Sequence, residues 1–257
     1  MNSVATGPKQ LESKILFLQP PFFRTASGST SHLHPAVSLF LCFVAFLLTA
    51  PQPAKASDVK ALAAAVDAHY NHLRSLQAEF TETYQGSGMD RTESGTLWLK
   101  KPGKMRWEYR SPRSKLFVSN GKEAWFYVPE DGQARKTSAQ KLDDVRSPLA
   151  FLLGKTRLEK ELRGLSLASD IPPVQSGDTV LRGVPTAWAD RVSEIVLEVT
   201  PGNQIVRIIV QGVDGATTEY RFTNQKEDVP IGNAQFDFNP PAGTEIVEGG
   251  LADGGLN

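Results

Sequence analysis

The stretch that decides the fold runs from Gly95 to Pro129 and reads GTLWLKKPGKMRWEYRSPRSKLFVSNGKEAWFYVP. It holds three of the four tryptophans. The dipeptides Pro102-Gly103 and Asn120-Gly121 divide it, and both are typical of turns; Asn-Gly in particular favours a tight hairpin because both of its residues tolerate positive φ. Four short antiparallel strands are therefore predicted: Thr96–Lys101, Lys104–Arg110, Lys115–Asn120 and Lys122–Val128.

The strand Lys104–Arg110 has the clearest two-sided pattern in the chain. Met105, Trp107 and Tyr109 alternate with charged residues, so one face is apolar and the other is charged. An apolar face of this kind needs a partner to cover it. Seven residues are predicted to share that face: Leu97, Leu99, Met105, Trp107, Leu116, Val118 and Phe126.

Upstream of this stretch, residues 58–75 carry apolar side chains at helical spacing and predict a helix. From Leu76 the pattern changes to period two, which indicates a strand that ends at the turn Gly86-Ser87-Gly88.

Downstream, Ser147-Pro148 begins a short, almost wholly apolar helix that ends at Gly154, and its side chains Leu149, Leu152 and Leu153 require cover. Residues 156–163 indicate a second, charged helix. Later strands are predicted at 193–200, 204–211, 217–224 and 235–239. The predicted fold class is therefore mainly β (α+β): a large curled antiparallel sheet, open or barrel-like, with helices against one face.

The N-terminal 56 residues are predicted to be a secretory signal peptide with a long leader. Residues 36–50 form an uncharged, mostly apolar run, which is followed by the small-x-small site Ala54-Lys55-Ala56. Cleavage after Ala56 leaves 201 residues as a single domain, with a glycine-rich flexible tail at 249–257. Because Cys42 lies inside the apolar run and follows Leu41, a lipid anchor on it is not expected. The mature chain then lacks cysteine, so the exported protein is expected to fold on its hydrophobic core alone, without disulfides.

Composition argues against several classes of function. Without residues 1–56 the chain keeps 24 basic and 27 acidic residues, so a net charge of −3 gives no electrostatic case for nucleic acid. No nucleophile motif, phosphate loop or Cys-x-x-Cys sequence is present. His69 and His72 have no obvious third metal ligand. Carboxylates such as Glu79 and Glu82 are interpreted as solvated, so neither catalytic residues, a metal site nor a cofactor is predicted.

The residue pattern by itself allows two interpretations of the apolar face. The helices at 58–75 and 148–153 could pack on it as an ordinary core. Alternatively, the helical segments are small for so broad a sheet and leave room for a cavity that binds an apolar ligand.

Several motifs, in order, resemble the periplasmic outer-membrane lipoprotein carrier family (LolA). They are the segments 95–102, Met105-Arg-Trp107, 119–122 with 125–129, 147–153 and 236–243. Each motif is short, but together they cover essentially all of the mature chain.

The resemblance implies an incomplete antiparallel β-barrel, or half-barrel, with helices covering an apolar cavity. It further implies a monomeric, non-enzymatic carrier in the periplasm that receives lipoprotein acyl chains beneath this helical lid. It also implies two partners: an ATP-driven inner-membrane exporter and an outer-membrane acceptor. In the family a basic residue, usually Arg, precedes the proline that corresponds to Pro102 and fastens the closed lid. Here that residue is Lys101, whose ammonium lacks the planar fork of Arg. A carrier of another lipid, a lipoprotein-sensing regulator with the same fold, and an esterase are the alternatives.

Overall fold

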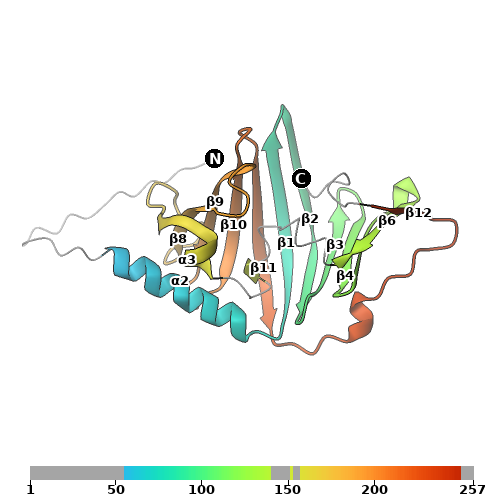
Figure 1. Ribbon diagram of the computed structural model, residues 1–257, viewed down its shortest axis with the longest axis horizontal. Coiled ribbons are helices and arrows are strands. Elements are labelled where there is room, and N and C mark those ends of the chain that lie inside the picture. Colours follow the sequence, from blue (N-terminus) through green and yellow to red (C-terminus); the bar gives the residue numbers. More distant parts are fainter. Residues whose placement is uncertain (1–54, 140–150, 153–156, 250–257) are drawn as a thin grey trace, which may run out of the picture. The chain divides into compact units, whose positions relative to one another are not determined.

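The structure, a computed structural model, describes residues 55–139, 151–152 and 157–249, with side chains from Asp58 onward. Residues 53–257 form one compact unit. Its body is a single 12-stranded sheet (Figure 1). Within the described ranges, no helix has the length and apolar character needed to cross a bilayer.

The first half of the sheet comes from consecutive hairpins. Its strands are β1 (Ser75–Gly86), β2 (Met89–Lys100), β3 (Lys104–Ser111), β4 (Lys115–Asn120), β5 (Glu123–Val128) and β6 (Gln133–Ser138). Each strand pairs antiparallel with the next. The turns at Pro102-Gly103 and Asn120-Gly121 separate β2 from β3 and β4 from β5, as the sequence predicts.

The second half joins the first along β1. Its strands are β7 (Leu162–Leu167), β8 (Thr179–Pro185), β9 (Val192–Val199), β10 (Ile205–Gly212) and β11 (Thr217–Glu227). The last strand, β12 (Glu245–Glu248), instead pairs with β6 at the outer edge of the first half. The spatial order is β12-β6-β5-β4-β3-β2-β1-β11-β10-β9-β8-β7. All pairs are antiparallel except β12 with β6. Because the order ends at β12 and β7 without closing, the predicted open antiparallel sheet is confirmed.

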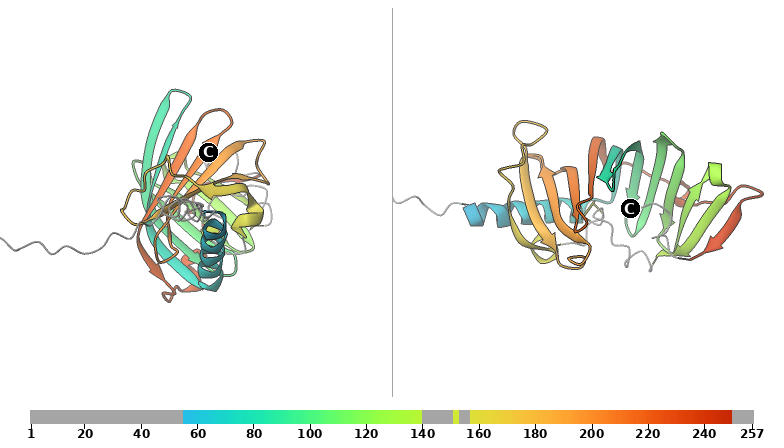
Figure 2. Two further views of the ribbon diagram at one scale, coloured as in Figure 1. Left: turned by 90° about the vertical axis from the view of Figure 1, so that its left-hand side faces the viewer. Right: turned by 90° about the horizontal axis from the view of Figure 1, so that it is seen from above.

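The helix α2 (Lys55–His72) crosses one face of the sheet, and the sheet curves around it (Figures 1 and 2). We call this the concave face and the opposite one the convex face. One stripe of the helix is buried and faces the sheet: Val59, Ala63, Val66, Tyr70 and, just beyond its end, Leu73. The three- and four-residue spacing of this stripe is the pattern that predicts the helix.

A bulge in β3, opposite Gly95 of β2, brings two aromatic rings together. Gly95 pairs with Phe80 on one side and Tyr109 on the other, and the register shifts at Ser94/Gly95. A Cβ at Gly95 would lie 1.9 Å from the Glu108 carbonyl oxygen, so no other residue fits there. The missing side chain leaves space in which the rings of Phe80 and Tyr109 meet edge to face, 4.9 Å apart.

Two predicted elements differ from the structure. Of residues 156–163, only Leu158–Glu161 is helical (α3), and Arg163 already lies in β7. The predicted strand at 235–239 is wrong, because Asn233–Phe236 forms a 3₁₀ helix, η5, and no strand follows until β12. A second 3₁₀ helix, η2 (Pro129–Asp131), precedes β6. The strands β6, β7, β8 and β12 were not assigned individually from the sequence.

Several predictions lie outside the described residues. They are the apolar run at 36–50, most of the predicted helix at 147–154 with Leu149 and Leu153, and the tail from residue 250.

Candidate functional site

The concave face carries the main apolar cluster of the protein. Five of the seven predicted cavity residues come together on it: Leu97, Leu99, Trp107 and Phe126 are buried, and Met105 packs against them partly buried. Side chains from β9, β10 and β11 continue the same cluster, among them Leu197, Ile208 and Phe222. The apolar surface is therefore continuous from β5 to β9.

Leu116 and Val118 do not belong to this face, so their predicted place is wrong. Trp107 pairs with Phe117, and directly paired residues point to the same side of a sheet. Leu116 and Val118 therefore point to the convex face, where they are buried with Phe236. Phe117, which is 4% exposed, is the concave residue that the sequence analysis missed.

Aromatic rings form the centre of the concave face. The Trp107 ring lies edge-on to Phe80, with centroids 4.7 Å apart, and also contacts Tyr220 at 6.2 Å and Phe222 at 6.3 Å. These rings come from β1, β3 and β11, which lie in the order β3-β2-β1-β11 in the sheet. Aromatic pairs in this geometry add packing energy to the burial of their surface.

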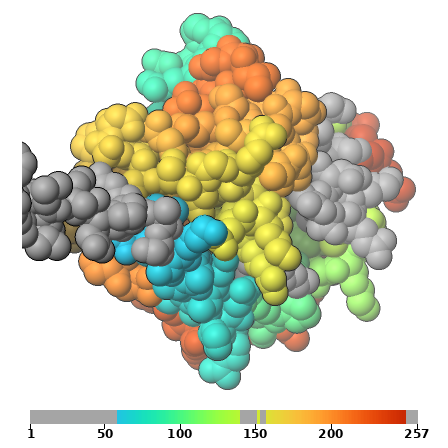
Figure 3. All heavy atoms as spheres, turned by 60° about the vertical axis from the view of Figure 1, so that its left-hand side comes forward, coloured from blue at the N-terminus to red at the C-terminus, as the bar shows by residue number. Residues whose placement is uncertain are grey.

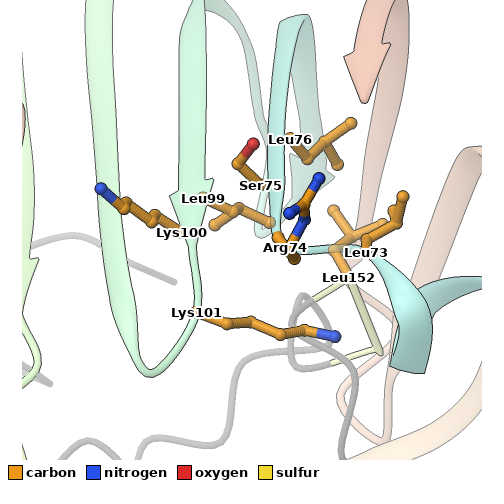
Figure 4. A pocket seen from close by; sticks show the side chains of 8 residues that line it. All are labelled: Leu73, Arg74, Ser75, Leu76, Leu99, Lys100, Lys101 and Leu152. Carbon is orange, nitrogen blue, oxygen red and sulfur yellow. The ribbon is translucent and has the colours of Figure 1, made fainter. Parts of the chain in front are cut away.

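At the end of α2, the concave face holds a small cavity. Leu73, Leu76, Leu99 and Leu152 line it together with the polar segment Arg74-Ser75 and with Lys100-Lys101 (Figure 4). Its volume is about 10 Å³, which is room for about one water molecule. Leu152, a predicted lid residue, is 3% exposed and packs into the main cluster beside this cavity.

Lys101 joins the β2–β3 turn to the end of α2. Its Nζ donates to the backbone carbonyl of Tyr70 at 2.5 Å and to that of Asn71 at 3.1 Å. These carbonyls belong to the last turn of α2, where the helix dipole is negative and a cation is favoured. Close by, the Tyr70 hydroxyl accepts a hydrogen bond from the Ile205 backbone N–H at 2.8 Å.

The middle of α2 is tied to α3. The carboxylate of Asp67 accepts the Leu158 N–H at 3.0 and 3.1 Å, and the two helices lie side by side on the surface (Figure 3). Burial raises the pKa of Asp67, although the Leu158 hydrogen bond opposes that rise. The helix is thus fastened to the sheet near its C-terminal end and to α3 near its middle.

Beyond the aromatic rings, the concave face ends in a buried polar cluster. We call Glu82, Arg91, Glu93, Tyr109, Lys115 and Tyr220 the polar cluster. The Tyr109 hydroxyl donates to Glu82 at 2.8 Å, and Lys115 pairs with Glu93 at 2.7 Å. Glu82 is only 3% exposed, so its interpretation as a solvated carboxylate is wrong. Burial is the main cause that raises its pKa, and the charge of Glu93 adds to the rise.

The described residues contain no group of three or more His, Cys, Asp or Glu side chains placed to hold a metal ion. The His69 ring nitrogen Nε2 lies 2.9 Å from the Glu227 carboxylate, and His72 Nδ1 lies 2.6 Å from the Ala68 carbonyl oxygen.

Comparison with known sequences finds relatives that match most of this chain. The sequence profile of the family described as outer membrane lipoprotein carrier protein LolA matches residues 71–239. An outer-membrane lipoprotein carrier protein from Chromobacterium violaceum is 30% identical over 198 residues, which cover 77% of this chain and 90% of that protein. One from Azotobacter vinelandii is 29% identical over 215 residues, covering 82% of this chain and 97% of that protein.

Among solved structures, an uncharacterized conserved protein from Thermus thermophilus aligns with 74% of this chain and 99% of its own, at 12% identity and a TM-score of 0.49. The profile match spans well over half of the chain, and it includes the aromatic centre of the concave face. The chain therefore belongs to the outer membrane lipoprotein carrier protein (LolA) family.

Proposed function

We propose that this protein is a periplasmic carrier that holds lipoprotein acyl chains against its concave face and ferries them from the inner to the outer membrane. The observation that carries the proposal is the breadth of the apolar face. It extends over β1 to β5 and β8 to β11, yet among the described residues one 18-residue helix and short segments at 151–152 and 158–162 cover it. Family membership supplies the class of ligand, because the similar proteins are named lipoprotein carriers.

A carrier of this kind solves an energetic problem. Burying a methylene group contributes about 0.8 kcal/mol, so one long acyl chain is held in a bilayer by roughly 10 kcal/mol. A lipoprotein cannot cross an aqueous compartment at a useful rate unless another apolar surface replaces the bilayer. By family, the loading partner is an ATP-driven inner-membrane exporter and the unloading partner an outer-membrane acceptor. The carrier itself hydrolyses nothing.

The described structure corresponds to the empty, closed state of such a carrier. The cavity beside Leu152 has a volume of about 10 Å³, far too small for an acyl chain. In this proposal hydrocarbon displaces the carrier's own apolar side chains from the sheet, and among the described residues α2 and the segment at 151–152 are elements that cover it. This displacement costs free energy that a preformed pocket would not require, which lowers affinity and allows release to the acceptor.

In this proposal Lys101 is the latch of the closed state. Because its ammonium holds the last turn of α2, replacing it should favour opening. We expect Lys101→Ala to bind a diacylated lipopeptide about ten- to a hundredfold more tightly, since hydrogen bonds from a charged donor contribute about 1.5–3 kcal/mol. Lys101→Arg should keep the wild-type affinity.

The matched control for the latch is Lys122→Ala, an exposed lysine in the neighbouring β4–β5 turn. Fluorescence titration of the four proteins with one labelled lipopeptide measures the effect. Equal affinities for Lys101→Ala and Lys122→Ala would show that Lys101 does not act as the latch of the closed state.

Retention of lipid in cells tests the carrier function itself. The mature protein, purified from the periplasm without detergent, should carry di- or triacylated lipoprotein that mass spectrometry identifies. Met105→Glu should lose this ligand, because it places a charge on the apolar face at a partly buried position. Val213→Glu, at a position 59% exposed in the β10–β11 turn, is the control and should retain it.

Bound glycolipid in place of lipoprotein would point to a carrier of another lipid. Equal retention by Met105→Glu and the wild-type protein would argue against the concave face as the binding site.

A further inference from the structure

The polar cluster lies at the end of the concave face that is remote from Lys101. Along β2, Glu93 is six residues from Leu99, which corresponds to about 20 Å at the usual rise per residue. Glu82 pairs with Glu93 on one side and with Tyr220 on the other, so the three side chains share the concave face. The face is therefore amphipathic in the direction of its strands, with aromatic rings in the middle and polar groups at one end.

Most polar atoms of this cluster bind one another. The Glu93 carboxylate forms ion pairs with Lys115 Nζ at 2.7 Å and with Arg91 Nε at 3.2 Å. The Glu82 carboxylate accepts a hydrogen bond from the Tyr109 hydroxyl. The Lys115 ammonium also lies over the Tyr109 ring, 4.4 Å from its centroid. Such a network keeps its members in fixed positions.

Tyr220 is the exception. It is 8% exposed, and its ring contacts Trp107 at a centroid distance of 6.2 Å. Its hydroxyl makes no hydrogen bond to any residue that the structure describes, and it is not one of the described polar atoms that are both shut off from solvent and unpaired, so a ligand group can reach it. Burial, followed by the negative charge of Glu82, raises the pKa of Tyr220 well above its usual value. The hydroxyl therefore keeps its proton at neutral pH and can donate it in a hydrogen bond.

A purely structural role explains this arrangement poorly. Apolar residues at these positions would cover the end of the sheet without the cost of burying two carboxylates. A ligand with an apolar and a polar part, in contrast, needs polar groups at a defined place beside an apolar surface, because those groups orient it. Tyr220 has both properties, since its ring belongs to the aromatic centre and its hydroxyl is available.

We propose that the Tyr220 hydroxyl donates a hydrogen bond to a carbonyl group at the junction between the acyl chains and the rest of an acylated ligand, and that the polar cluster orients this junction. The inference rests on the carrier function proposed above. The carbonyl belongs either to an acyl ester or to the first peptide units of a lipoprotein, and both have the same hydrogen-bonding chemistry.

Matched lipids test this contact. The probes are a dipalmitoylglyceryl lipopeptide, its ether-linked dialkyl analogue with the same peptide, free dipalmitoylglycerol, and the free dialkylglycerol that lacks a carbonyl. Competition against a fluorescent lipid measures the affinity of each probe for the wild-type protein, for Tyr220→Phe and for Tyr127→Phe. Tyr127 is a control tyrosine that packs on Phe238 in the convex cluster.

We expect Tyr220→Phe to weaken the ester-linked lipopeptide about three- to tenfold, the usual net effect of one hydrogen bond, and to leave the free dialkylglycerol unchanged. Tyr127→Phe should change no affinity. Loss with both ester-linked probes assigns the carbonyl to the acyl ester, and loss with both lipopeptides alone assigns it to the peptide; either result supports the proposal.

Unchanged affinities in Tyr220→Phe, or equal weakening of all four probes including the dialkylglycerol, would overturn the proposal. Melting curves establish that the variants are folded. A wild-type protein that binds none of the probes would instead contradict the carrier function, so the two failures are distinct.

Discussion

Trp107→Ala is expected to lower the free energy of unfolding by about 3–5 kcal/mol, the range for removing a large aromatic side chain from a packed core. Trp107 is 3% exposed and contacts Phe80, Tyr220 and Phe222. Its loss leaves a cavity on the concave face, where aromatic side chains from β1, β3 and β11 contact one another. Urea unfolding at 25 °C, followed by far-UV circular dichroism, measures the change.

Trp98→Ala is the control for this prediction. Trp98 belongs to the neighbouring strand β2 but packs, only partly buried, against the convex cluster. The same truncation should therefore cost clearly less there. Equal losses for the two tryptophans would contradict the prediction that the concave aromatic centre contributes more to stability than the packing of Trp98 on the convex cluster.

Glu198→Ala is expected to lower the free energy of unfolding by a comparable amount, about 3–5 kcal/mol, because it removes the nearest counter-ion of the buried Arg207 guanidinium and leaves only Glu219, 3.8 Å away. Glu198 is fully buried, and its Oε2 lies 2.6 Å from Arg207 Nη2. Its other oxygen accepts the Val174 N–H at 2.7 Å, and so fastens the segment between β7 and β8 to the convex side of the sheet. Denaturant unfolding at neutral pH gives the value.

The double variant Glu198→Leu/Arg207→Met separates the lost ion pair from lost packing. Replacing both charges with apolar groups of similar volume removes the unpaired charge, so stability should recover in large part. The recovery should be incomplete because the Val174 N–H still lacks its acceptor. A double variant as unstable as Glu198→Ala would mean that packing, and not the unpaired charge, accounts for the loss.

Local sequence patterns were sufficient for the strands that pair with their neighbours in the chain. The alternation in Lys104–Arg110 predicts β3, and the turn at Asn120-Gly121 predicts β4 and β5. Both signals are local, because the turn of a hairpin fixes the register of the two strands that it joins. Strand β12 gives no such signal. Its four residues are all exposed or partly exposed, and its partner β6 lies about a hundred residues earlier.

The candidate site was predicted only in part, for a physical reason that its residues make clear. Leu116, Phe117 and Val118 are consecutive apolar residues, and both faces of β4 are covered. Alternation therefore could not tell which of them points to the concave side. The covering group on the convex side is Phe236, which arrives from a segment more than a hundred residues away. The same segment misled the strand prediction at 235–239.

Glu82 could have been placed from the sequence. Leu76, Ala78 and Phe80 set the inward side of β1, and Glu82 continues that alternation. A carboxylate at an inward position of a strand indicates a buried polar group. The interpretation of Glu82 as solvated is therefore inconsistent with the alternation of β1. The polar cluster, by contrast, could not be predicted, because its residues come from five strands whose pairing and register no local sequence pattern gives.

Photo-crosslinking tests the central claim most directly. A lipopeptide with a diazirine at the ends of its acyl chains is bound to the purified protein and irradiated, and the labelled residues are identified by tandem mass spectrometry. We predict labels on concave residues such as Leu97, Trp107 and Phe117. Labels confined to the convex residues Trp125 and Phe236, with the concave face unlabelled, would contradict the account.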